Sequence, residues 1–170
     1  MKTVQIQFTR REYDLLPEGF PAQLVEGCLV RSPSPTYGHQ AIVNRLLAAL
    51  FRQFAVDCIR PAPMDVILDE HNVYQPDVLV FREPPPDEGR GEVLPLICFE
   101  VLSPSTAWRD RETKLPHLLA AGVREVWLLD PRQRTIEVHD ESGARTVREE
   151  EPIRSRTLPT LRLTPAALYG

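Results

Sequence analysis

One apolar run with a single carboxylate inside it constrains this chain more than any other feature. Residues 94–102 read LPLICFEVL, and Ser103, Pro104 and Ser105 follow directly. A short apolar run bounded by turn-forming residues is typical of a buried strand. A carboxylate in a buried strand is costly unless a metal ion, a cation or hydrogen bonds stabilise it. Glu100 is therefore a candidate functional residue.

A second carboxylate stands at the start of another apolar run. Residues 74–81 read YQPDVLVF, so Asp77 opens this predicted strand. Asp77 and Glu100 are separated by a strand, a loop and a strand, and in neighbouring strands both side chains would reach one edge of a sheet. Carboxylate oxygens are the ligands that Mg²⁺ and Mn²⁺ prefer, together with water and phosphate oxygens. The pattern predicts a metal site on Asp77 and Glu100, although Asp after Pro is also common in turns.

Lysine use in this chain is unusual. The chain has two lysines, Lys2 and Lys114, against 18 arginines. Lys114 follows Glu100 by 14 positions, on the helix predicted to leave that strand. An ammonium near the two carboxylates would stabilise developing negative charge or orient an attacking water. The alternative is a solvated lysine paired with Asp110, one helical turn earlier.

The whole-chain composition sets the broad class. A length of 170 residues with 42% hydrophobic content suits a single domain, residues 1–170, with a substantial core. The net charge of −4 argues against a strongly basic nucleic-acid-binding protein, but a local groove can still be basic. We expect Cys28, Cys58 and Cys98 to be buried thiols in a reducing compartment. We see no signal peptide or membrane span and therefore expect a cytoplasmic protein.

Periodicity and turn signals predict an α/β fold with a mixed central sheet flanked by helices. Helices are predicted at 10–16, 39–54, 108–121 and after Thr164, and Pro116 should kink the third or mark a restart. Strands are predicted at 22–30, 56–59, 64–68, 73–81, 94–102 and 123–129, with a hairpin over 134–149. The strand at 94–102, the following helix and the strand at 123–129 fit a right-handed crossover. We expect Trp108 and Trp127 to be core residues.

Several segments of the chain form a recognisable set: QPD at 75–77, FEVLSPST at 99–106, Lys114 and AGVREVWLLDP at 121–131, with LVEGCLV at 24–30, Ser32-Pro33 and His39 nearer the amino end. Taken together, these segments resemble the Uma-type restriction endonuclease family, part of the PD-(D/E)XK nuclease superfamily. The resemblance implies a restriction-endonuclease-like fold and a Mg²⁺- or Mn²⁺-dependent DNA endonuclease. It also implies a metal site on Asp77 and Glu100 with Glu26 as a further acidic member.

Three positions depart from the pattern that the resemblance implies. The superfamily lysine usually stands two residues after the acid, and Leu102 occupies that position here. Lys114 would supply the amine from the helix instead. Leu118 and Val126 replace two aromatic residues of the family.

Several alternatives stay open at this point. Glu26 precedes Gly27 and is equally well explained as a turn residue, and His39 as a helix-start or surface residue. The chain could also be a catalytically silent nuclease-fold module that binds nucleic acid or a protein. For an active enzyme we expect a homodimer, because cutting two strands commonly needs two sites and two-fold dimers are the commonest oligomers.

Overall fold

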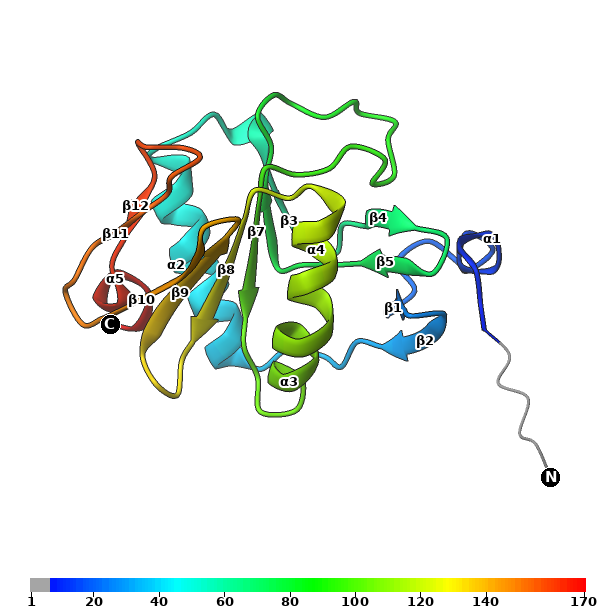
Figure 1. The fold of residues 1–170 in the computed structure, drawn as a ribbon, viewed down its shortest axis with the longest axis horizontal. Helices are drawn as coiled ribbons and strands as arrows, with labels where there is room; N and C mark the ends of the chain where they lie inside the picture. Colours follow the sequence, from blue (N-terminus) through cyan, green and yellow to red (C-terminus); the bar gives the residue numbers. More distant parts are fainter. Residues whose placement is uncertain (1–6) are drawn as a thin grey trace.

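A six-stranded mixed sheet organises the protein, whose computed structural model describes residues 7–170 (Figure 1). Its strands lie in the order β10-β9-β8-β7-β6-β3, and β7 and β8 are parallel while the other neighbours are antiparallel. The strands are β3 (Ile59–Pro61), β6 (Val78–Val80), β7 (Ile97–Val101), β8 (Glu125–Asp130), β9 (Thr135–Asp140) and β10 (Gly143–Arg148).

Helices cover both faces of this sheet. Helix α2 (Tyr37–Phe51) lies behind one face, and α3 (Ala107–Arg109) and α4 (Leu115–Ala121) cross the other (Figure 1). Alternate residues of each strand contribute to two separate apolar clusters, so that Phe99 packs on the α2 side and Cys98 on the α4 side. This period-2 alternation is what a sheet buried on both faces requires. The predicted α/β class with a mixed central sheet is confirmed.

A smaller sheet packs beside the large one. It has the strand order β2-β1-β5-β4 and contains β1 (Ala22–Val25), β2 (Cys28–Arg31), β4 (Val66–Asp69) and β5 (Asn72–Tyr74). The predicted strand at 73–81 is therefore two strands, β5 and β6, in different sheets. Gln75 and Pro76 separate them, and Pro76 cannot donate a ladder hydrogen bond.

The connection from β7 to β8 contains an irregular helix. A π-turn over Asp110–Lys114 joins α3 to α4, and the Leu115 N–H donates to the Asp110 carbonyl. Pro116 then lies in the first turn of α4, where a missing N–H costs little, so the restart alternative is the one observed. Gly122 ends α4 with φ of 111°.

The remaining elements are short: α1 (Arg10–Tyr13), a 3₁₀ turn (Val56–Cys58), the strand pair β11 (Ile153–Arg154) and β12 (Arg162–Leu163), and α5 (Pro165–Tyr169). The predicted strand at 56–59 is mostly this 3₁₀ turn. Among residues 7–170, no helix is both long and apolar enough to span a bilayer.

Three burial predictions were wrong. Trp108 is 60% exposed, Cys28 is exposed and Cys58 is only partly buried, whereas Trp127 and Cys98 are fully buried as expected. Trp108 lies in the three-residue α3, no residue of which is buried.

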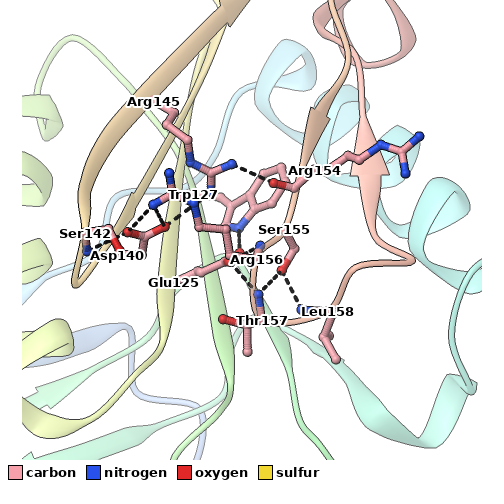
Figure 2. Close-up of polar contacts among 10 residues, drawn as sticks. All are labelled: Glu125, Trp127, Asp140, Ser142, Arg145, Arg154, Ser155, Arg156, Thr157 and Leu158. Carbon is pink, nitrogen blue, oxygen red and sulfur yellow. Dashed lines mark hydrogen bonds and ion pairs between the residues drawn. The ribbon is translucent and has the colours of Figure 1, made fainter.

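Glu125 fixes the carboxy-terminal segment to the sheet (Figure 2). Its fully buried carboxylate accepts hydrogen bonds from the N–H groups of Arg156 and Thr157, at 2.6 and 2.9 Å, and from Trp127 Nε1 at 2.8 Å. Asp140 holds the same segment through the Arg156 guanidinium, at 3.1 Å. Buried carboxylates are tolerated when donors satisfy them in this way.

Candidate active site between β6, β7 and the crossover helix

The pairing of β6 with β7 brings Asp77 and Glu100 together. Val78 lies opposite Phe99 in the antiparallel register, so the next positions along are Asp77 and Glu100. Directly opposed residues of an antiparallel pair project from the same face. The Val101 N–H donates to Asp77 Oδ2 at 2.7 Å and so fixes one oxygen of that carboxylate.

Glu100 is a buried acid with a buried cation against it. Its exposed fraction is 5%, and Oε1 forms an ion pair with the Lys114 ammonium, which is itself 3% exposed. Burial raises the pKa of Glu100 to about 8, and the charge of Lys114 opposes that rise only in part. The Glu100 carboxylate therefore takes up a proton more readily than an exposed glutamate does.

Lys114 reaches Glu100 from the helix and not from the strand. Asp110, also buried, lies 3.3 Å from the ammonium through Oδ1, and the ring of Tyr74 lies 5.9 Å from it. Burial alone would lower the pKa of Lys114, but the carboxylates of Glu100 and Asp110 outweigh it and raise the pKa. Leu102 is 5% exposed and packs in the apolar cluster on the α4 side.

His39 lies against Asp77. It stands in the first turn of α2, where its N–H donates to the capping Thr36 Oγ1, as a helix-start residue would. Its side chain is only 18% exposed, and Nε2 lies 3.3 Å from Asp77 Oδ2. The hydrogen bond to Asp77 raises the pKa of His39, against the effect of burial. Local sequence carries no signal for this contact, since α2 and β6 are far apart in the chain.

These residues line a cleft of about 570 Å³. Its walls include Asp77, Glu100, Asp110, Lys114 and His39, with Arg31 and Arg109 as further cations and with the loop of Ser103, Ser105 and Thr106. Arg31 and Arg109 place positive charge locally on a chain of net charge −4.

The carboxylates fit a hard divalent cation. Within residues 7–170, neither Asp77 Oδ1 nor Glu100 Oε2 accepts a hydrogen bond, although each residue has its other oxygen engaged. Two carboxylate oxygens at a wet cleft suit Mg²⁺, which keeps several of its waters. No group of three or more His, Cys, Asp and Glu side chains in the described part of the chain forms a ready metal cage. Water and substrate oxygens would therefore complete the coordination.

The structure does not bring Glu26 into this cleft. Glu26 and Gly27 form the turn between β1 and β2, with φ of 49° and 74°. Its side chain is 66% exposed and lies 3.9 Å from His117 Nε2. Glu26 is not among the residues that line the cleft, in line with the turn alternative.

Comparisons with known proteins bear on the family and the fold of the chain. A family model, Uma2, described as "Putative restriction endonuclease", matches residues 8–166. A crystal structure titled as a "putative nuclease" from Anabaena variabilis superposes with a TM-score of 0.81 at 22% identity, over 95% of this chain and 97% of that one. A search of curated protein sequences finds no match.

Proposed function

Since the chain belongs to the Uma2 restriction endonuclease family, we propose that it is a metal-dependent endonuclease that hydrolyses phosphodiester bonds in DNA. The observation that carries this proposal is the meeting of Asp77, Glu100 and Lys114 in one cleft. A buried acid and a buried lysine are expensive to maintain for stability alone, because apolar residues of similar volume are often equally stable.

Asp77 and Glu100 would hold Mg²⁺ or Mn²⁺ through the two oxygens that lack hydrogen bonds. Such an ion lowers the pKa of a bound water, polarises a phosphoryl oxygen and stabilises a leaving oxygen. The protein supplies the orientation. The Val101 N–H and His39 hold Asp77 Oδ2, and Oδ1 would be the oxygen that binds the ion.

Lys114 supplies a fixed positive charge beside the scissile phosphate. Glu100 and Asp110 keep its ammonium charged and prevent it from moving into solvent. Preorganised charge of this kind stabilises the negative charge that develops in the transition state. Arg31 and Arg109 would contact flanking phosphates from the cleft walls.

A metal titration separates this proposal from its alternative. Mn²⁺ should raise the melting temperature of the wild-type protein, because it binds the folded state alone. Asp77→Asn should abolish that shift, whereas Glu26→Gln should retain it as the matched control. Cleavage of DNA with Mg²⁺ or Mn²⁺ should occur with wild type and be lost in Glu100→Gln.

The alternative is a catalytically silent module of the same fold. The observation that favours it is the ion pair of Glu100 with Lys114, since an oxygen held by an ammonium is not free to bind a metal ion. A protein that binds nucleic acid but shows no Mn²⁺-dependent stabilisation and no cleavage would support this module.

For cleavage of both strands of a duplex, we propose a homodimer with two such clefts. Light scattering should then give twice the mass of the chain, and a monomer at assay concentration would count against double-strand cleavage by one assembly.

A further inference from the structure

We propose that the cleft takes a nucleic acid strand whose bases are unpaired, and that exposed aromatic side chains at its margins hold the strand by stacking. This inference rests on the proposed function, because it names the substrate class of the same cleft. It is carried by the placement of Phe20, Tyr37 and Trp108.

Each of these aromatic residues is exposed beside a residue that lines the cleft. Phe20 lines the cleft itself and is 42% exposed. Tyr37 is 97% exposed and follows the lining residue Thr36, and Trp108 is 60% exposed and precedes the lining residue Arg109. Arg109 lines the cleft and lies against the Trp108 ring, so Trp108 is linked to this surface by contact and Tyr37 by its place next to Thr36 in the chain. Large exposed aromatic side chains at a concave site mark a binding surface.

Trp108 and Arg109 form a unit suited to nucleic acid. The Arg109 guanidinium carbon lies 5.4 Å from the centre of the Trp108 ring. Arg109 can thus meet a phosphate while the outer face of the indole remains available to a base. Bases stack on aromatic rings with little sequence preference, and arginine adds a cation–π contribution.

The charge distribution favours an unpaired strand over a duplex. Binding of duplex DNA depends on neutralising many phosphates. This chain has a net charge of −4, and the cationic residues on the cleft walls are Arg31, Arg109 and the buried Lys114. In a duplex the faces of the bases are already stacked on one another, so the aromatic side chains could reach them only after unpairing.

A second hollow extends the path of such a strand. It has a volume of about 320 Å³ and shares Phe20 and Gln75 with the cleft, so the two spaces adjoin at Phe20. Asp14, Glu18 and Asp65 line this hollow with one cation, Arg90, which lies 4.0 Å from Glu18, so the lining is acidic on balance and disfavours a phosphate. We therefore expect a base to enter it, beside the ring of Phe20. An unpaired strand also needs only one cleft, so this inference does not require a dimer.

Tryptophan fluorescence gives a direct test. Trp127 is fully buried, so only Trp108 can stack on an added base. A mixed-sequence oligonucleotide of roughly 12 nucleotides, within the range that single-strand grooves cover, is titrated in EDTA to prevent cleavage. The single strand should quench the emission, and the same sequence as a duplex should not. Trp108→Phe should lose the quench but keep the affinity measured by anisotropy of a labelled strand.

Alanine variants then measure the contribution of stacking. Trp108→Ala should weaken single-strand binding by roughly 5- to 150-fold, the range expected for one stacked base. Phe51→Ala is the matched control, because Phe51 is 45% exposed at the other end of α2, and its affinity should not change. Equal binding of RNA and DNA single strands would support the inference, since both present the same stacking chemistry.

The outcomes separate this inference from the proposed function. Tighter binding of the duplex, unchanged binding by Trp108→Ala, or no binding of any strand would overturn the inference. Duplex cleavage in Mg²⁺ that is insensitive to Trp108→Ala would overturn it while the endonuclease proposal stands. Trp108-dependent binding of single strands without cleavage in Mg²⁺ or Mn²⁺ would support it and remove the endonuclease proposal.

Discussion

Replacing Lys114 with methionine tests the centre of the site, because it removes the ammonium and keeps most of the volume. The ammonium is the cation in contact with the carboxylates of Glu100 and Asp110, which are 5% and 6% exposed. Breaking a buried ion pair by removing one partner costs about 3–5 kcal/mol, since the remaining charge is uncompensated. Glu100 can limit the cost by taking up a proton, because its pKa is already about 8. We therefore expect a loss of about 3 kcal/mol at neutral pH.

Urea unfolding followed by the fluorescence of the buried Trp127 measures this loss. The double variant Lys114→Met with Glu100→Gln should recover part of the stability, because it also removes the Glu100 carboxylate that lost its cation. The double-mutant cycle gives the coupling free energy between the two side chains. Arg124→Met is the matched control for removing an exposed cation and should change the stability by less than about 0.5 kcal/mol. A loss below about 1 kcal/mol in Lys114→Met would refute the buried ion pair.

Activity supplies the second readout for Lys114. Under conditions where the variant is folded, cleavage should fall by about a hundredfold or more, the loss typical of one preorganised electrostatic group. Mn²⁺ binding should persist or tighten, because a competing cation is gone. Lys114→Arg should not restore full activity, since a broad planar guanidinium cannot replace a compact ammonium. Full cleavage by either variant would show that this amine has no part in the chemistry.

Two further predictions concern stability away from the cleft. Hydrogen bonds from His139 and Arg111 lower the pKa of Glu137 to about 2, so the stability that Glu137 contributes is present above pH 4.5 and is lost as the pH falls toward 2. Acid titration of Glu137→Gln should show a flatter loss over that window, and an unchanged slope would contradict the assignment. Glu125→Ala removes the acceptor of three hydrogen bonds and leaves the buried Trp127 Nε1 unpaired, so it should cost about 2–3 kcal/mol, measured by thermal unfolding. A melting temperature within 2 °C of the wild-type value, roughly 1 kcal/mol or less, would show that Glu125 does not hold the carboxy-terminal segment.

The sequence could predict the parts of the site that depend on strand pattern. Glu100 stands out because an acid interrupts an apolar run, and Asp77 because it opens the neighbouring run; their separation fits the pairing of β6 with β7. Lys114 follows from its rarity and its place on the crossover helix. The α/β class follows from the same periodicities, because burial of a sheet on both faces requires them.

Contacts between distant elements could not be predicted in this way. The position of His39 against Asp77 depends on how α2 packs on the sheet, and the local pattern of α2 does not encode that packing. Trp108 lies in the three-residue α3, and the periodicity over 108–121 predicts one continuous helix and does not separate α3 from α4. Glu26 belonged to a recognisable family segment, but its side-chain direction depends on a turn with positive φ at two positions.

Because Lys114 ends the π-turn over Asp110–Lys114, the site depends on the number of residues in this turn as well as on their identity. Each residue of a helix turns the next side chain by about 100°, so deleting one codon before Lys114 would rotate the ammonium away from Glu100 while every other site residue remained. Such a deletion would keep the acid and the lysine in the sequence and still break their ion pair. A lysine at position 102 could not easily supply the amine in place of Lys114, because its side chain would enter the apolar cluster that Leu102 now fills. The position of the acid is thus set by the register of a strand, and the position of the amine by the rotation of a helix.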